Sequence, residues 1–184
     1  KIIPNKIKSL SSGIDHLKKS VLLIPYNDIK LTKKILDKYH KKISAIIIEP
    51  IQCGIPYKKS NNYLKFLEKY CRSKKIILWF DEVITGFGRT GAWFAFQQED
   101  IRPDMVTLGK GITAGYFPLA AVAVDKQIYD DFIYHKIPLK MVITMAGHPT
   151  GCSIALKAIE IIERDNLRDK IVLNEQTIRS QFEQ

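Results

Sequence analysis

Long apolar runs, paired cysteines and repeats are scarce in this sequence. No apolar run approaches the ~20 residues that a transmembrane helix needs, and the opening KIIPNKIKSL lacks the apolar stretch of a signal peptide. The three cysteines, Cys53, Cys71 and Cys152, have no CxxC spacing, so the sequence predicts neither a metal site nor a disulfide framework. We therefore expect no membrane partner and a reduced, cytoplasmic compartment.

The net charge of +10 does not by itself indicate a nucleic-acid partner. Lys and Arg total 29, but they are spread along the chain in pairs such as Lys18–Lys19 and Lys74–Lys75. These pairs lack the interleaved aromatic residues of a single-strand binder. Hydrophobic residues make up 46% and charged residues 26%, which is typical of a globular protein. We expect a folded domain, or part of a larger one, that binds no nucleic acid.

Apolar β-branched runs alternate with amphipathic segments along the chain. The pattern predicts strands at 43–49, 76–80, 105–108 and 119–124, and helices at 28–39, 62–73, 127–134 and 151–184. A break in the last helix is expected near Asp165–Asn166. The first two apolar runs are continuous, which predicts strands buried on both faces of a parallel sheet. This order favours an α/β fold with ligands at the carboxyl ends of the strands.

Polar side chains follow three of these predicted strands: Glu49, Asp81 with Glu82, and Lys110. Because strand ends in such a sheet meet at one edge, we expect these groups to share a rim. Asp81 at a strand end could equally cap a turn, the usual role of Asp there. A plain structural ion pair between Asp81 and Lys110 is a further alternative. The residues alone leave these interpretations open.

Four longer motifs favour a shared rim over a turn cap or a plain structural ion pair. IIIEP, WFDEVITGFGRTG, RPDMVTLGKGITAGYFPLAAV and TMAGHPTGC occur in this order, and together they closely resemble the class III aminotransferases, pyridoxal-phosphate enzymes of fold type I. The resemblance runs over about residues 25–163 and implies a three-layer αβα fold with a mostly parallel sheet. It assigns residues 1–163 to a partial cofactor-binding large domain. Residues 164–184 become the start of the helical connection to a C-terminal small domain, so the chain resembles a fragment.

The resemblance implies a role for each matching residue. Lys110 matches the lysine that forms the Schiff base with pyridoxal 5'-phosphate and then carries a proton between substrate and cofactor. Asp81 matches the aspartate that pairs with the pyridine nitrogen. Val83 matches the apolar residue packed against the ring, although simple core packing would look the same. Thr144 matches a threonine that binds the cofactor phosphate, commonly across a dimer interface, or is an ordinary loop hydroxyl.

Three other residues carry open assignments. Glu49 matches a family glutamate near the substrate, or is a strand-end acid satisfied by nearby backbone. Arg89, in GFGRTG, is expected to tie the glycine loop to a neighbouring carboxylate or carbonyl. Ile84 stands where many family members have glutamine, which favours ω-amino-acid and taurine-like donors over the ornithine and 4-aminobutyrate branches.

The activity implied by the resemblance is transamination, in which an amino group moves from an amine or amino acid to a 2-oxo acid. A homodimer is also implied, since family active sites form at the subunit interface. Two alternatives stay open: a racemase or aminomutase on the same scaffold, and a truncated chain that keeps the fold without activity. The family's upstream phosphate loop, cofactor-stacking aromatic and substrate-binding arginine have no match in this sequence.

Overall fold

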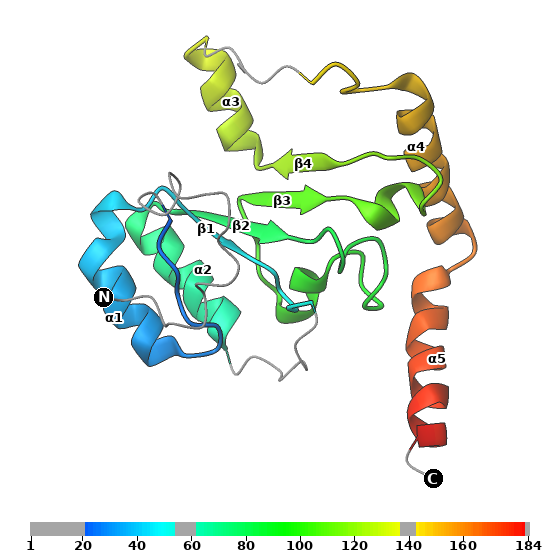
Figure 1. Cartoon of the computed structure of the whole chain (residues 1–184), viewed down its shortest axis with the longest axis horizontal. Helices are drawn as coiled ribbons and strands as arrows, with labels where there is room; N and C mark the ends of the chain where they lie inside the picture. Colours follow the sequence, from blue (N-terminus) through cyan, green and yellow to red (C-terminus); the bar gives the residue numbers. More distant parts are fainter. Residues whose placement is uncertain (1–20, 54–61, 137–142, 183–184) are drawn as a thin grey trace, which may run out of the picture. The chain divides into compact units, whose positions relative to one another are not determined.

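The computed structural model describes residues 21–53, 62–136 and 143–182, and the chain divides into two compact units, residues 1–42 and 43–184. The first unit contains helix α1 (Ile29–Tyr39), drawn in blue in Figure 1, and a short 3-10 helix, His40–Lys42. Asp28 caps α1, because its side chain accepts a hydrogen bond from the Leu31 amide at 2.8 Å. The predicted helix at 28–39 is confirmed.

The second unit is built on a four-stranded sheet in the order β1-β2-β3-β4 (Figure 1). Strands β1 (Ala45–Ile48), β2 (Ile77–Asp81) and β3 (Met105–Leu108) are parallel, and β4 (Ala121–Val124) runs antiparallel to β3. All four predicted strands are present, and the predicted α/β class with a mostly parallel sheet is confirmed. Because β1, β2 and β3 are parallel neighbours, their carboxyl ends lie at one edge of the sheet.

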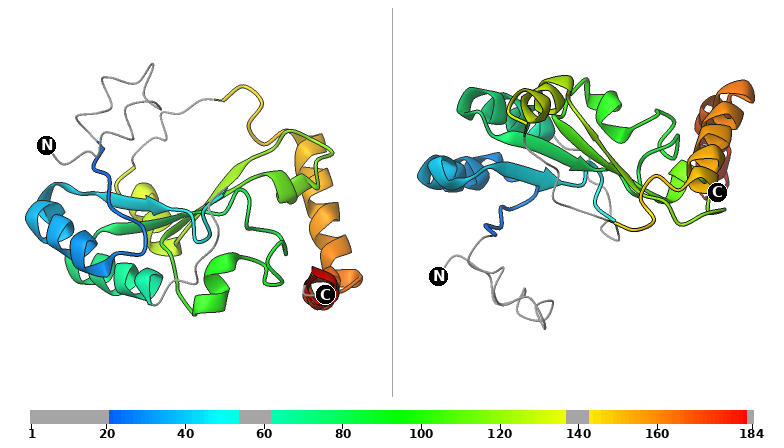
Figure 2. Two further views of the ribbon diagram at one scale, coloured as in Figure 1. Left: turned by 60° about the horizontal axis from the view of Figure 1, so that its bottom comes forward. Right: turned by 90° about the horizontal axis from the view of Figure 1, so that it is seen from above.

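Helices and short 3-10 segments connect the strands of this unit or follow the last of them. They are α2 (Tyr63–Lys74), η4 (Ala95–Glu99), η5 (Lys110–Thr113), α3 (Lys126–Tyr134), α4 (Pro149–Arg164) and α5 (Leu167–Phe182). Asp165 ends α4 and Asn166 has a positive φ of 48°, so the predicted break between the last two helices is confirmed. Figure 2 shows α4 and α5 beyond the carboxyl ends of the parallel strands, and α4 packs against η5.

The core of the second unit lies between α2 and β2. Leu64 and Leu67 on α2 are buried, as are Leu78 and Phe80 on β2. Leu64 and Leu67 recur at helical spacing, whereas Leu78 and Phe80 alternate with period two, so each element presents one apolar face. This packing fixes β2, the strand that ends in Asp81.

The predicted burial of the first strand on both faces is wrong. Ile46 is buried, but Ile47, the next residue of β1, is 61% exposed. Successive side chains of a strand point to opposite faces, and among the described residues β1 lies at the edge of the sheet and pairs with β2 alone. β4 forms the other edge and is exposed at Val122 and Val124. A continuous apolar run therefore does not distinguish an edge strand from a central one.

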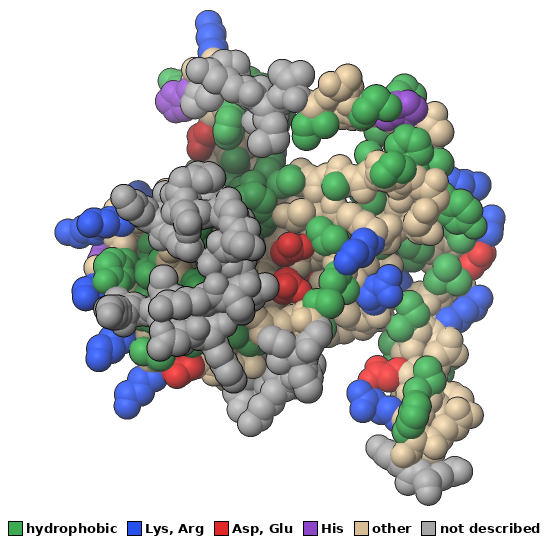
Figure 3. All heavy atoms as spheres, in the orientation of Figure 1, with side chains coloured by type: hydrophobic (Ala, Val, Ile, Leu, Met, Phe, Trp, Pro, Cys, Tyr) green, Lys and Arg blue, Asp and Glu red, His purple; other side chains and the backbone are tan. Residues whose placement is uncertain are grey.

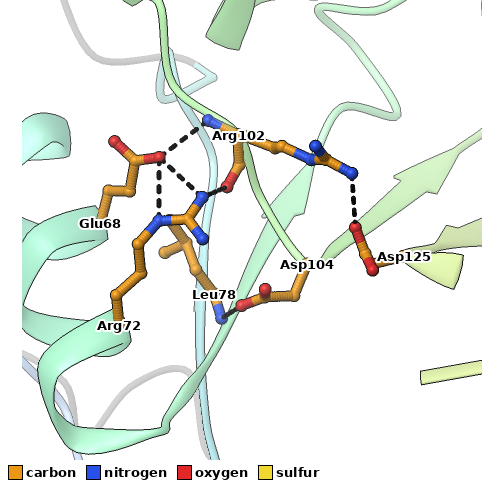
Figure 4. Close-up of polar contacts among 6 residues, drawn as sticks. All are labelled: Glu68, Arg72, Leu78, Arg102, Asp104 and Asp125. Atoms are coloured by element: carbon orange, nitrogen blue, oxygen red, sulfur yellow. Dashed lines mark hydrogen bonds and ion pairs between the residues drawn. The ribbon is translucent and has the colours of Figure 1, made fainter. Parts of the chain in front are cut away.

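A polar network joins the elements at the amino ends of β2 and β3 (Figure 4). Its members are Glu68, Arg72, Leu78, Arg102, Asp104 and Asp125. Asp104 accepts the Leu78 amide at 2.7 Å and, through its carbonyl, the Asp125 amide at 2.8 Å. Arg102 binds the Asp125 carboxylate at 2.9 Å and donates its amide to Glu68 at 3.1 Å. The network links α2, β2 and β4 at the end of the sheet opposite to the predicted rim.

Surface charge is arranged in local pairs. On the face drawn in Figure 3, Lys and Arg side chains lie at several separate places. Several are bound to a carboxylate one turn away on the same helix, as in Lys33–Asp37 and Arg179–Glu175. Exposed pairs of this kind contribute little to stability. None of the described helices is long and apolar enough to cross a membrane.

Candidate active site at the carboxyl edge of the sheet

The carboxyl edge of the sheet gathers the polar residues that the sequence singles out. Glu49 directly follows β1, Asp81 ends β2, and Lys110 lies two residues beyond β3. In the parallel register, Ile48 pairs with Phe80, one residue before Asp81. The three strand ends therefore share one edge, as the sequence predicts.

The turn after β2 contacts the turn after β3. A Cβ atom added to Gly109 would lie 3.3 Å from Cγ1 of Val83, so Val83 packs directly on the Gly109 backbone. Any larger residue at position 109 would push Val83 away, which is a physical reason for glycine here. Asp81 lies two residues before Val83, and Lys110 directly follows Gly109. This one contact joins the segments that carry the two groups.

The carboxylate of Asp81 is held by one of its two oxygens. Oδ1 accepts a hydrogen bond from the Val83 amide at 3.0 Å. The turn-capping interpretation is therefore confirmed for this oxygen. Within the described residues, Oδ2 has no hydrogen-bond or ion-pair partner. One oxygen thus orients the half-buried side chain, while the other remains able to bind a cationic or N–H group.

Lys110 has an uncommitted amine and an unusual backbone. Its side chain is exposed and forms no ion pair or hydrogen bond with the described residues. The structural ion pair between Asp81 and Lys110 is therefore not present. Lys110 has φ of 41°, in the left-handed region that is disfavoured for residues with a Cβ. Such conformations occur where the surroundings hold them, often at functional sites.

Glu49 is partly committed to the backbone. Its Oε2 atom accepts the Cys53 amide at 3.0 Å, which stabilises the turn after β1. The backbone-satisfied interpretation is confirmed for this oxygen. A role toward substrate stays a prediction.

Thr144 lies outside this cluster. It is exposed, in the turn before α4, and it makes no hydrogen bond with the described residues. His148, which directly follows the turn, stacks its ring on that of Phe117, in the segment before β4, at 5.2 Å between centroids. No hydrogen bond among the described residues joins Thr144 to Asp81 or Val83, and its phosphate-binding role across an interface stays a prediction.

The expectation that Arg89 ties down the glycine loop is wrong. Arg89 is exposed and has no hydrogen-bond or ion-pair partner in the part of the chain that the structure describes. Glu82 holds the two ends of this loop together instead. Its fully buried carboxylate accepts hydrogen bonds from the amides of Ala95 at 3.0 Å and Phe96 at 2.9 Å, and from the Thr85 hydroxyl.

Sequence reasoning missed this role of Glu82. The available signal was its place directly after Asp81 at the end of a strand. Because successive residues of a strand face opposite sides, one of the two acids had to point away from the other. The alternation does not say which of them points inward.

The motifs and this geometry can be compared with known proteins. The family model described as Aminotransferase class-III matches residues 3–184. The chain belongs to the class III aminotransferases. Members of this family depend on pyridoxal phosphate, and the solved structures of similar transaminases share the mixed α/β fold of this chain.

Curated relatives include two kinds of aminotransferase. An adenosylmethionine-8-amino-7-oxononanoate aminotransferase of Geobacter sulfurreducens is 37% identical over 76% of this chain and 32% of its own length. An ornithine aminotransferase of Oceanobacillus iheyensis is 37% identical over 80% of this chain and 35% of its own length. The chain thus spans about a third of the length of the curated relatives it matches.

Solved structures agree with the family assignment. An acetylornithine aminotransferase from Elizabethkingia anophelis superposes with a TM-score of 0.79 at 32% identity, covering 87% of this chain and 41% of that one. An (S)-enantioselective ω-transaminase from Thermomicrobium roseum gives a TM-score of 0.72 at 34% identity, covering 76% and 32%. The chain therefore has the fold of part of these enzymes.

The residues at the rim fit the cofactor of the family. The Oδ2 atom of Asp81, which has no partner among the described residues, is the type of acceptor that a protonated pyridine nitrogen needs. The amine of Lys110, likewise without a partner there, suits an aldehyde carbon. Val83, which packs on the backbone of Gly109 between them, is the apolar side chain available to such a ring. No group of three or more His, Cys, Asp or Glu among the described residues could hold a metal ion.

Proposed function

We propose that the full-length protein containing this chain is a pyridoxal-phosphate-dependent aminotransferase that moves an amino group from an amine or amino acid to a 2-oxo acid. One observation carries the proposal. The contact of Val83 with Gly109 joins the two segments that bear Asp81 and Lys110, and each of these side chains has a polar atom without a partner among the described residues. Membership in the class III family supports it.

The side chains divide the work as follows. Pyridoxal phosphate, when bound, supplies an aldehyde and an electron-accepting ring. The amine of Lys110 would hold the cofactor through its aldehyde and would move a proton at the substrate. Oδ2 of Asp81 would hold the proton of the ring nitrogen, while the Val83 amide fixes Oδ1. Val83 would provide an apolar contact for the ring and exclude water there.

Further assignments belong to the same proposal. Thr144 would bind the cofactor phosphate in a homodimer, and Glu49 would face the substrate with the oxygen that Cys53 leaves unbound. Residues 1–163 would belong to the cofactor-binding domain and 164–184 to the start of the connection to a small domain. The free thiols of Cys53, Cys71 and Cys152 support a reduced, cytoplasmic location.

The proposed donors are ω-amino acids and taurine-like amines. Ile84 supports this preference, because it replaces the glutamine of many family members next to the Asp81 turn. The similarity to a solved ω-transaminase also supports it. Turnover of β-alanine, taurine and ornithine by the full-length protein tests the preference. A kcat/KM for ornithine above those for the other two donors would refute it.

Replacement of Lys110 tests the main proposal. Lys110→Ala in the full-length protein should abolish the visible absorbance of the lysine-bound cofactor and the lysine adduct trapped by borohydride. Lys74→Ala is the matched control, since Lys74 is exposed and lies at the far end of α2. A reducible adduct that persists at another lysine of the Lys110→Ala active site would contradict the assignment.

Replacement of Asp81 tests the role of its charge. Asp81→Asn keeps the oxygen that accepts the Val83 amide and removes the negative charge, so thermal stability should change little. We expect kcat to fall about 10²-fold or more, the scale for loss of one preorganised electrostatic contact. Unchanged turnover would contradict the role.

Turnover of the amine donor by the wild-type protein without any 2-oxo acid would instead indicate a racemase or aminomutase.

A further inference from the structure

The glycine loop (Gly86–Trp93) supports the backbone around Lys110. A Cβ atom added to Gly111 would lie 3.0 Å from Cβ of Phe87 and 3.5 Å from the carbonyl oxygen of Gly86. Phe87 and Lys110 both have left-handed φ values, 57° and 41°. Phe87 packs on Gly111, the residue that directly follows Lys110, so the two disfavoured conformations lie on either side of one close contact.

The other side of this glycine loop rests on helix α5. A Cβ atom added to Gly88 would lie 3.1 Å from Cγ of Arg168, and one added to Gly91 would lie 2.8 Å from Cγ2 of Val172. The guanidinium carbon of Arg168 lies 5.0 Å from the centre of the Trp93 ring. This distance is within the ~6 Å range of a cation–π interaction. Arg168 thus contacts two separate residues of the loop, Gly88 and Trp93.

Arg168 is committed to the loop. Its guanidinium forms no ion pair or hydrogen bond within the described residues, whereas Arg164 and Arg179, on α4 and α5, each bind a carboxylate. The loop is closed by a hydrogen bond from the Gly88 amide to the Trp93 carbonyl at 3.3 Å. By covering Gly88 and Trp93 together, Arg168 clamps the two residues that this hydrogen bond joins.

We infer that Arg168 is a positioning residue for Lys110: it clamps the glycine loop from α5, and the loop fixes the Lys110 backbone through the contact of Phe87 with Gly111. The clamp itself depends on contacts of this chain alone, and its effect on catalysis rests on the proposed function. Arg168 touches neither substrate nor cofactor in this scheme. It sets the position from which the Lys110 amine reaches them.

Hydrogen exchange of the cofactor-free, full-length protein tests the clamp. Arg168→Gln keeps the methylene contact with Gly88 and removes the cation from Trp93. We expect about fivefold faster amide exchange in residues 86–93 and also in 109–113, the scale of one cation–π interaction. Arg179→Gln, on the same helix, is the matched control and should leave both segments unchanged. Unchanged exchange at 109–113 in Arg168→Gln would overturn the inference.

Two further measurements separate the clamp from a general loss of stability. In a Trp93→Leu background, Arg168→Gln should add no further increase in exchange, because the partner is already gone. Arg168→Lys, which keeps the cation, should restore part of the protection, and it serves as the test variant if Arg168→Gln does not fold. A full additional effect in the Trp93→Leu background would overturn the inference.

The effect on the lysine amine has its own readout. In the cofactor-loaded protein, Arg168→Gln should shift the pH midpoint of the visible absorbance and lower kcat without raising KM for the donor. Arg179→Gln should change neither. A wild-type protein without the visible lysine adduct would overturn the proposed function, and exchange at 109–113 would still decide the clamp. A normal pH midpoint and kcat in Arg168→Gln would overturn the link to Lys110.

Discussion

Glu82→Gln is the substitution with the most direct structural prediction. The Glu82 carboxylate receives the Ala95 and Phe96 amides at 3.0 and 2.9 Å, one on each oxygen, and the Thr85 hydroxyl. Glutamine has one acceptor oxygen, so one of the two amides must lose its partner whichever way the side chain turns. The hydroxyl can rotate and accept instead. An orphaned backbone donor costs about 1–3 kcal/mol, and loss of charge assistance adds about 1 kcal/mol.

We therefore expect Glu82→Gln to lower the free energy of unfolding by about 2–4 kcal/mol. Urea unfolding of the full-length protein measures this change, and hydrogen exchange localises it, with faster exchange of the Ala95 or Phe96 amide. Glu163→Gln is the control, since Glu163 is exposed and forms no side-chain hydrogen bond with the described residues. A loss below about 0.5 kcal/mol, the usual size of a surface substitution, with unchanged exchange would refute the reasoning.

Three other predictions concern separate regions. Gly91 has φ of 87°, and a Cβ there would lie 2.8 Å from Cγ2 of Val172. Gly91→Ala should therefore lower the free energy of unfolding by about 1–3 kcal/mol, seen as a lower melting temperature. Adding Val172→Ala should restore part of this loss, because it removes the clashing methyl group. The pKa of Asp125 is lowered in the folded protein, chiefly by a hydrogen bond from the Gln127 amide. The ionised carboxylate therefore stabilises the fold above the ordinary Asp pKa of about 4. This contribution is lost as the pH falls through the lowered pKa of the folded state. The melting-temperature difference between wild type and Asp125→Asn should narrow from pH 6 to pH 3; a constant difference would argue against it. Burial raises the pKa of the Cys71 thiol to about 12, so iodoacetamide at pH 8 should label Cys71 after unfolding and not before, as peptide mass spectrometry can show.

Local signals in the sequence were sufficient for most of the elements. The strand at 105–108 has the predicted bounds, because Asp104 and Gly109 mark its two ends. The helix start at Asp28 follows from a capping side chain, which acts within three residues. The order of strands along the chain also places Glu49, Asp81 and Lys110 at one edge without any knowledge of distances. These features depend on neighbours in the sequence or on the rules of parallel sheets.

Contacts between distant segments were beyond the sequence. The exposure of Ile47 depends on the position of β1 in the sheet, which an apolar run does not encode. The inward orientation of Glu82 depends on the amides of a segment thirteen residues later. Arg89 and Arg168 are the same residue type, and the sequence does not distinguish them. Within the described residues Arg89 has no partner, whereas Arg168 covers Trp93. Their difference arises from where α5 returns to the loop.

Residues that stabilise the fold and residues proposed for the chemistry lie near opposite ends of β2. β2 has five residues, which span roughly 15 Å at about 3.3 Å each. That length exceeds the screening distance of about 8 Å at physiological ionic strength. Charge changes at Arg102 or Asp125 should therefore leave the electrostatic potential at Asp81 and Lys110 nearly unchanged. Stabilising substitutions at the amino end of the sheet can be combined with substrate-altering ones at the carboxyl end, and their effects should add.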